Sequence, residues 1–170
     1  MSPTKVFTSS TVYFPDSAPS PGTIEIDLST GKITKIEHTK VQEGDARFAK
    51  DAEWVDVGDR AIIPGLVDSH VHLNEPGRTE WEGFRTGTQA AASGGCTTVI
   101  DMPLNSNPPT TTVANLKTKL DAAKDQCWTD IGFWGGVIPG NADDLRPLVA
   151  DGVKGFKCFL IESGVEVRPQ

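Results

Sequence analysis

Apolar and polar residues alternate in short runs through the first sixty positions. The runs occupy residues 5–14, 23–27, 33–37 and 53–63. Alternation with a period of two is typical of β-strands that bury one face. Between the second and third runs, Gly31 provides the positive φ that a tight turn needs, which predicts a hairpin. Residues 1–60 are therefore expected to form a small β-rich domain.

From Ile62 onward the pattern changes to strand, loop and helix, repeated. Strands are predicted at residues 66–72, 97–102, 130–138 and 155–160. The first three strands are each followed by a predicted helix, of which the first ends at Gly94 and the other two are capped by Thr112 and Asn141. Four strands in a row, three of them followed by a helix, indicate parallel pairing through right-handed crossovers.

This order of elements predicts an α/β fold. It fits either the N-terminal half of a (β/α)8 barrel or an open doubly wound sheet. An eightfold barrel needs about 250 residues, whereas only about 110 residues follow Arg60. If the fold is a barrel, residues 61–170 hold its first four β/α units, and the other units lie outside this chain.

Helical spacing also predicts which side chains face the core. The expected inward positions are Trp81, Phe84, Thr88 and Ala91 in the first helix, Val113, Leu116, Leu120 and Ala123 in the second, and Leu145, Leu148 and Val149 in the third. Apolar residues at this spacing form one face of a helix. Trp81 and Phe84 are therefore interpreted as packing residues rather than as a cage for a ligand.

Two histidines lie at the end of the first predicted barrel strand. His70 and His72 are two residues apart, so the strand period directs both imidazoles to one side. Neutral imidazoles bind divalent metals, and barrel enzymes build their sites at this end of the strands. Asp68 shares that side and is expected to orient one of the imidazoles. Taken alone, the pattern also fits a packed or surface pair of histidines.

Composition and charge exclude several classes of protein. The net charge is -7, and no run of five Lys or Arg residues occurs, so neither nucleic acid nor a membrane surface is an expected partner. No stretch reaches the roughly eighteen apolar residues of a membrane span, and the chain starts without a signal-peptide pattern, so we expect a cytoplasmic protein. Cys96, Cys127 and Cys158 are odd in number and far apart, which favours reduced, partly buried thiols.

Longer motifs connect the two histidines to a known family. Residues 63–72, IPGLVDSHVH, resemble the opening signature of the amidohydrolase superfamily, and residues 73–84, LNEPGRTEWEGF, are similar to the cyclic amidohydrolases. Residues 94–106 and 155–160 continue the similarity, which covers nearly the whole chain. Within the cyclic amidohydrolases the resemblance is greatest to the allantoinases.

The resemblance implies a centre of two zinc ions. It identifies His70 and His72 as metal ligands, and it places Lys157 at the family position of a lysine that carbon dioxide converts to a bridging carbamate. Burial would assist this reaction, because it favours the neutral amine. The remaining histidine ligands and the aspartate that serves as general acid and base are expected beyond Gln170, so this chain alone would be incomplete and inactive.

Strand alternation supports Lys157 over its neighbour Lys154 as the ligand. Residues of the same parity as Lys157 are expected to face the barrel axis, and Lys154 has the other parity. The expected axis-facing residues are Gly155, Lys157 and Phe159, and the expected helix-facing residues are Phe156, Cys158 and Leu160.

The resemblance also implies a substrate. Dihydroorotases carry an arginine at the position of Asn74, which suits a substrate carboxylate. Allantoin has no carboxylate, and the amide of Asn74 can both donate and accept hydrogen bonds to its ureide groups. Asn105 is a second expected contact, although either residue could instead only shape its loop. The implied reaction is hydrolysis of allantoin to allantoate in purine catabolism, by a protein that is a homo-oligomer when full length.

Two alternatives stay open on the sequence. The protein could be a dihydropyrimidinase or hydantoinase, while Asn74 disfavours a dihydroorotase. In a different class, it could be a non-enzymatic relative of these enzymes that acts through assembly. Such relatives commonly lack metal ligands, whereas His70, His72 and Lys157 are all intact here.

Overall fold

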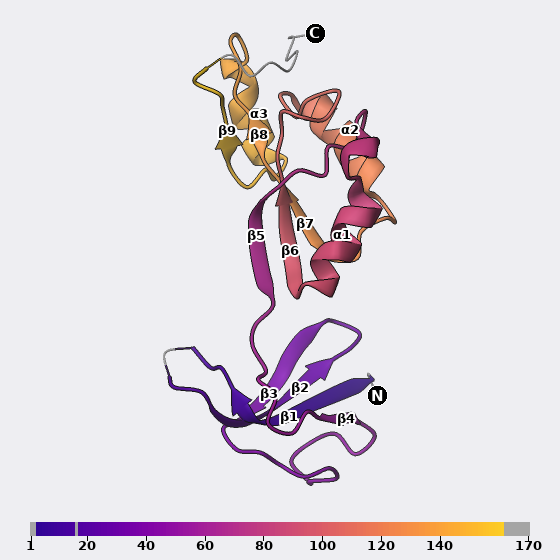
Figure 1. The fold of residues 1–170 in the computed structure, drawn as a ribbon, viewed down its shortest axis with the longest axis vertical. Coiled ribbons are helices and arrows are strands. Elements are labelled where there is room, and N and C mark those ends of the chain that lie inside the picture. Colours follow the sequence, from indigo (N-terminus) through magenta and orange to yellow (C-terminus); the bar gives the residue numbers. More distant parts are fainter. Residues whose placement is uncertain (1–2, 16, 162–170) are drawn as a thin grey trace. The chain divides into compact units, whose positions relative to one another are not determined.

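The computed structural model describes residues 3–15 and 17–161 of the chain. The chain divides into two compact units, Met1–Pro64 and Gly65–Gln170. Figure 1 shows strands in the first unit and a mixture of strands and helices in the second. Within the described residues, no helix is long and apolar enough to cross a membrane.

The first unit is a four-stranded sheet with the order β3-β2-β1-β4. Its strands are β1 (Thr4–Val12), β2 (Ser20–Asp27), β3 (Lys32–Glu37) and β4 (Glu53–Asp56). The predicted hairpin is confirmed, because β2 and β3 are antiparallel, Ile24 lies opposite Ile36, and Gly31 has a φ of 67° in the turn. The fourth strand is shorter than predicted and ends at Asp56, and Ile62 rejoins the sheet through a bridge to Val12.

A small hydrophobic core packs against this sheet. Val6, Val41 and Phe48 are buried, and the Trp54 ring packs edge-on against Phe48 with ring centroids 5.4 Å apart. His38 lies in this unit with its ring 4.3 Å from that of Phe14. His38 therefore packs against Phe14 within the first unit.

Asp45 and Arg47 form a bidentate ion pair on the surface of the first unit. Arg47 Nε and Nη2 donate to the two carboxylate oxygens of Asp45 at 2.9 and 3.0 Å. These hydrogen bonds lower the pKa of Asp45 from its ordinary 3.8 to about 2. Because this pKa is lower in the folded state than in the unfolded chain, the pair stabilises the fold fully above about pH 4 and loses its effect as the pH falls through about 2.

We expect the Arg47→Ala variant to raise the pKa of Asp45 part of the way back toward 3.8, because the two side-chain donors are removed while the backbone N–H of residue 47 remains. A carboxyl-carbon NMR titration measures this pKa directly. Lys40→Ala is the matched control, since Lys40 pairs with Asp56 at 2.8 Å instead and should leave Asp45 unchanged. An Asp45 carboxyl that titrates near 3.8 in the unmodified chain would contradict the expectation.

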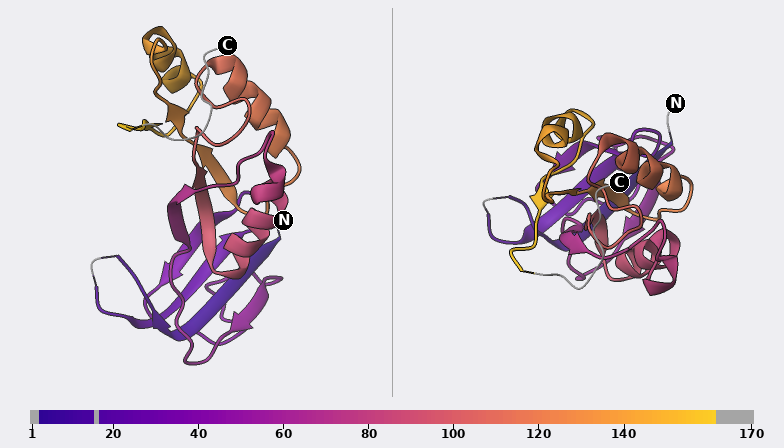
Figure 2. Two further views of the ribbon diagram at one scale, coloured as in Figure 1. Left: turned by 45° about the horizontal axis from the view of Figure 1, so that its top comes forward. Right: turned by 90° about the horizontal axis from the view of Figure 1, so that it is seen from above.

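The second unit is built on parallel strands, as predicted. β5 (Leu66–Val71), β6 (Cys96–Asp101) and β7 (Asp130–Phe133) form a three-stranded parallel sheet, and β8 (Gly135–Gly136) pairs in parallel with β9 (Phe156–Lys157). The helices are α1 (Phe84–Ser93), α2 (Val113–Ala123) and α3 (Leu145–Ala150), with short 3-10 turns at Thr79–Trp81 and Ala142–Asp144. Figure 2 shows α1 running alongside the three-stranded sheet.

The core of this unit lies between the sheet and the helices. Its buried members are Leu73, Phe84, Val99, Leu116, Ala123, Phe133, Leu148 and Val153. Phe84 of α1 meets Phe133 of β7 edge to face, with centroids 6.1 Å apart. Helix α2 begins as predicted, because the Thr112 side chain accepts a hydrogen bond from the Asn115 amide at 3.2 Å.

Two predicted strands are shorter in the structure. Residues 130–138 form two strands separated by Trp134, and residues 155–160 reduce to β9. The segment 130–138 is divided because its two parts pair with different strands: β7 pairs with β6, whereas β8 pairs with β9. The Trp134 amide still donates to the Asp101 carbonyl at 3.1 Å, so the chain continues past the break without leaving the sheet region.

The inward faces of the helices differ from the prediction at three positions. Trp81, Leu120 and Val149 are 53%, 42% and 57% exposed. In α2 the core side is instead formed by Leu116, Lys119 and Ala123, because the charged Lys119 takes the inward place next to Leu120. Trp81 lies in a 3-10 turn outside α1, where its ring stacks under the Arg78 guanidinium at 5.0 Å.

Asn141 does not cap a helix with its side chain, contrary to the prediction. Its amide nitrogen donates to the carbonyls of Thr111 and Gly136 at 3.0 and 2.9 Å, and its Oδ1 accepts from the Ile138 amide at 3.0 Å. The side chain therefore ties two loops together. A 3-10 turn follows it, and α3 begins only at Leu145.

Candidate metal centre

The carboxyl ends of β5 and β9 bring together three side chains that the sequence identified. His70 lies in β5 and His72 follows that strand, and their ring centroids are 5.3 Å apart. Lys157 ends β9, and its Nζ lies 3.3 Å from His70 Nε2 although 87 positions separate the two residues. The fold thus gathers two imidazoles and one amine at the ends of parallel strands, which is where barrel enzymes place their catalytic groups.

His70 and Lys157 border a hollow of about 390 Å³, whereas His72 lines a neighbouring hollow of about 350 Å³. Ser69, His70, Met102, Trp134 and Lys157 are among the residues that line it. The Trp134 indole donates from Nε1 to the Ser69 carbonyl at 2.9 Å, which fixes the aromatic ring beside β5. A hollow of this volume accommodates a small organic molecule.

The His72 imidazole is held in its neutral form. Burial of the ring lowers its pKa below the ordinary 6.5, and the positive charges of Lys157 and His70 lower it further, against weaker opposing effects from Asp101 and Asn74. A neutral imidazole carries a free lone pair at neutral pH, which is the form that binds a metal ion.

Lys157 is half-buried, and its Nζ also lies 5.3 Å from the centre of the Phe159 ring. The predicted alternation does not continue beyond it, because β9 ends at this residue. Cys158 is exposed and lines the same hollow as Lys157, and Leu160 is 94% exposed, so neither faces the helices as expected. The expectation of a partly buried thiol therefore holds for Cys96 and Cys127 but not for Cys158.

The donor set fits a metal centre that includes a modified lysine. Among the described residues, no three His, Cys, Asp or Glu side chains gather into a metal-binding group. The two imidazoles are nevertheless adjacent, and the nearby Lys157 would supply oxygen donors once its amine is carboxylated. An unmodified ammonium group has no lone pair to offer a metal, so Lys157 would have to be carboxylated to act as a ligand.

Asp68 acts on the backbone rather than on an imidazole. Its Oδ1 accepts a hydrogen bond from the His70 amide nitrogen at 3.0 Å. The sequence expectation that it orients a histidine ring is therefore not met in this structure. Asp68 instead fixes the main chain from which His70 projects.

Asn74 is a buried residue in contact with His72. It is 5% exposed, has a φ of 62°, and donates from Nδ2 to the His72 carbonyl at 3.2 Å. Asparagine tolerates this left-handed conformation better than most residues. Its Oδ1 is buried and has no hydrogen-bond partner within the described part of the chain. A buried carbonyl of this kind is costly unless something donates to it.

Asn105 lies in the loop that follows β6. Its main-chain carbonyl accepts a hydrogen bond from Arg78 Nη1 at 2.6 Å, so this loop is tied to the segment that follows Asn74. A second tie runs between the same two segments, where the Asn107 amide donates to the Pro76 carbonyl at 2.8 Å. The structure thereby fixes the backbone of Asn105 near the chain that carries the histidines.

Sequence reasoning missed a buried ion pair beneath this site. Asp101 and Lys119 are 0% and 1% exposed, and the Lys119 ammonium donates to the Asp101 carboxylate. The other carboxylate oxygen accepts from the amide of Leu73, the residue after His72, at 2.7 Å. Two features of the sequence could have indicated this ion pair. Asp101 ends a strand of otherwise β-forming residues, and Lys119 lies three positions after Leu116, on the same face of the helix.

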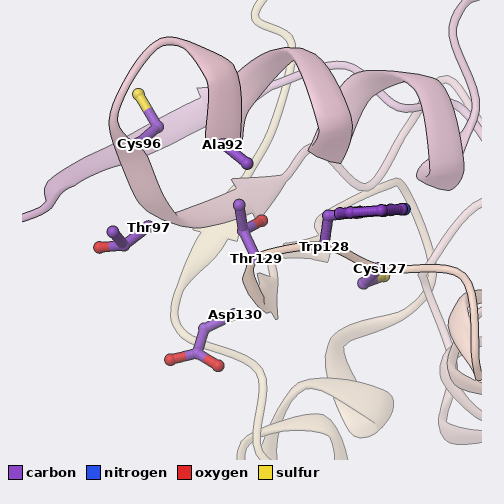
Figure 3. A pocket seen from close by; sticks show the side chains of 7 residues that line it. All are labelled: Ala92, Cys96, Thr97, Cys127, Trp128, Thr129 and Asp130. Carbon is purple, nitrogen blue, oxygen red and sulfur yellow. The ribbon is translucent and has the colours of Figure 1, made fainter. Parts of the chain in front are cut away.

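A larger hollow, of about 440 Å³, opens at the opposite ends of the strands. Figure 3 shows the side chains that line it: Ala92, Cys96, Thr97, Cys127, Trp128, Thr129 and Asp130. They come from the end of α1 and from the starts of β6 and β7. This set contains no histidine or lysine, and the amino ends of barrel strands contribute to stability rather than to catalysis.

Comparison with known proteins defines the class to which this fold and site belong. The model of the amidohydrolase family matches residues 61–168. Because this match covers more than half of the chain, the chain belongs to the amidohydrolase family. The matched segment includes both histidines, Asn74 and Lys157.

Within this family, several curated proteins that are similar to this chain are allantoinases. The chain is 56% identical to the allantoinase of Saccharomyces cerevisiae over 148 residues, which are 87% of this chain and 31% of that protein. It is 54% identical to the allantoinase of Streptomyces avermitilis over 145 residues, which are 85% of this chain and 32% of that protein. The chain thus spans about a third of the length of the curated relatives it matches.

Solved structures show the same fold. The L-hydantoinase (dihydropyrimidinase) from Arthrobacter aurescens is 27% identical with a TM-score of 0.76, over 92% of this chain and 32% of that chain. The dihydropyrimidinase from Brevibacillus agri is 28% identical with a TM-score of 0.76, over 95% of this chain and 34% of that chain. These neighbours are TIM-barrel amidohydrolases, and the predicted α/β class is therefore confirmed.

Proposed function

We propose that the full-length protein hydrolyses the cyclic amide C–N bond of allantoin to give allantoate, at a centre of two zinc ions to which His70, His72 and a carboxylated Lys157 contribute. The observation that carries this proposal is the 3.3 Å approach of Lys157 Nζ to His70 Nε2. Two segments far apart in sequence converge there, on residues that suit metal ligation. The identity of 54% or more to allantoinases supports the choice of substrate.

The residues of this chain prepare the centre in two ways. The neutral His72 ring presents a lone pair without first losing a proton. For carboxylation, the Lys157 amine would lose a proton to water and attack carbon dioxide, so that an N–C bond forms, one C=O π bond breaks, a second N–H proton leaves to water, and a carbamate anion results. When bound, zinc lowers the pKa of a coordinated water and polarises the amide carbonyl.

Asn74 and Asn105 are the proposed substrate contacts. The buried Oδ1 of Asn74 accepts no hydrogen bond of regular geometry in the described residues and has only a weak interaction with His72, and an N–H group of a ureide would provide a full donor. Allantoin is rich in such N–H groups and carries no carboxylate, so neutral amide side chains match it better than an arginine. Asn105 would approach from the loop that Arg78 holds in place.

Hydrolysis of hydantoin or dihydrouracil is the second candidate activity. It is favoured by the structural likeness to a hydantoinase and a dihydropyrimidinase, although these are only 27% and 28% identical in sequence. The family resemblance also implies a homo-oligomer, and the lack of a signal-peptide pattern predicts a cytoplasmic protein. Both points remain predictions, and one similar allantoinase, from Aquarana catesbeiana, is named as mitochondrial.

We expect the full-length protein to turn over allantoin with a kcat/KM at least about a hundredfold above that for hydantoin or dihydrouracil, because unpaired polar groups in a site penalise the wrong ligand. Steady-state assays on the three compounds at matched zinc loading give this ratio. Equal or higher kcat/KM for hydantoin or dihydrouracil would overturn the choice of allantoin. Absence of turnover with all three would overturn the enzymatic proposal itself.

A further inference from the structure

The buried pair of Asp101 and Lys119 connects three elements next to His72. Asp101 ends β6, Lys119 lies in the middle of α2, and the amide that Asp101 accepts belongs to Leu73, just after β5. Lys119 also donates to the Met102 carbonyl at 3.3 Å. Each polar group of the pair therefore has a partner, which a buried charge requires.

The Leu73 amide is the point at which this pair acts on the site. β5 ends at Val71, and the chain turns at Asn74 with a φ of 62°, so the segment between them is outside regular pairing. The Met102 amide donates to the Val71 carbonyl at 2.9 Å, and Asp101 Oδ1 accepts from Leu73 at 2.7 Å. His72 lies between these two anchors, and its carbonyl accepts from Asn74.

We propose that the Asp101–Lys119 pair is a positioning device that sets the His72 imidazole beside His70 for metal binding. Asp101 holds the backbone on the carboxyl side of His72, and Lys119 neutralises the buried carboxylate. The pair contacts neither metal nor substrate, so it acts through the backbone of the ligand. This inference rests on the proposed metal centre.

Double variants of the full-length protein separate positioning from simple stabilisation. Asp101→Asn with Lys119→Met removes both charges but keeps an oxygen that can accept from Leu73. Asp101→Leu with Lys119→Met removes both charges and the acceptor as well. Neither variant leaves an unpaired buried charge, so the main difference between them is the hydrogen bond to Leu73.

We expect the acceptor-free double variant to bind zinc about 10 to 100 times more weakly than the unmodified protein, as is usual when an indirect support of a metal ligand is removed. The Asn–Met variant should stay within about threefold of the unmodified protein, since the acceptor is retained. Chelator competition measures the affinity, and the visible spectrum of the Co²⁺-loaded protein reports the ligand geometry. In activity assays of the acceptor-free variant, kcat should fall while KM changes little.

Equal zinc affinity of the two double variants would overturn the positioning role while leaving the proposed function intact. Failure of the unmodified protein to bind zinc at His70 and His72 would overturn the proposed function instead. If the acceptor-free variant does not fold, hydrogen exchange of the unmodified protein decides. The inference requires a protected Leu73 amide, and exchange at the rate of a free amide would refute it.

Discussion

Replacing Lys157 by alanine in the full-length protein is expected to lower kcat/KM for allantoin by at least about a thousandfold, because the loss of the proposed bridging ligand would remove several kcal/mol of metal-dependent stabilisation of the transition state. Its amine is 3.3 Å from His70 Nε2, and both residues line the same hollow. Zinc content measured by mass spectrometry should fall together with activity.

Two controls make this result specific to the carbamate. Lys154→Ala removes an exposed lysine three positions away and should leave zinc content and kcat/KM unchanged. Addition of a short carboxylic acid such as acetate or propionate should restore part of the activity of Lys157→Ala, because its carboxylate can occupy the place of the carbamate. Full activity of Lys157→Ala without any added acid would contradict the assignment.

Replacing Phe84 by alanine should produce the largest loss of stability. Phe84 is 0% exposed, packs edge to face on Phe133 and belongs to the central cluster of the second unit. Removing a buried phenylalanine side chain costs about 3–5 kcal/mol, through lost burial and the cavity that remains. Urea unfolding followed by far-UV circular dichroism measures the change in the free energy of unfolding.

Trp81→Ala is the matched control for Phe84→Ala. Trp81→Ala also removes a large aromatic side chain. Trp81 is 53% exposed, however, and its ring stacks against the Arg78 guanidinium. Its loss should change the free energy of unfolding by less than about 1 kcal/mol. An equal loss for both variants would show that the burial of Phe84 does not account for its contribution.

The order of elements and the strand partners followed well from the sequence. Period-two alternation located the hairpin of Ile24 and Ile36, and the repeated strand and helix pattern gave the parallel strands of the second unit. The prediction that Thr112 caps a helix is confirmed, because its side chain accepts a hydrogen bond from the nearby amide of Asn115. These features depend on neighbours in sequence, which periodicity and capping rules describe well.

Features that depend on tertiary partners could not be predicted in this way. Leu120 seemed an inward residue by spacing, but Lys119 is buried in its stead because Asp101 offers a partner across the core. Asn141 was expected to cap a helix, but distant carbonyls at Thr111 and Gly136 take its amide. Strand alternation beyond Lys157 failed because β9 has a partner only at Gly135 and Gly136.

For the candidate site, the sequence supplied the residues and the structure supplied their proximity. His70 and His72 were expected to share a side because of the strand period, and the structure places their rings 5.3 Å apart. Lys157 entered through resemblance to the family, since spacing alone does not relate it to His70. The support of His72 by Asp101 and Lys119 was invisible to motif reasoning, because it joins three segments that are separate in sequence.

The central claim, that His70, His72 and carboxylated Lys157 form part of a two-zinc centre, is tested most directly by a crystal structure of the full-length protein with anomalous data at the zinc edge. The account predicts two anomalous peaks, imidazole nitrogens of His70 and His72 about 2.0–2.1 Å from one of them, and continuous density from Lys157 Nζ into a carbamate that bridges both. An unmodified Lys157, with no anomalous peak within ligand distance of either histidine, would contradict it.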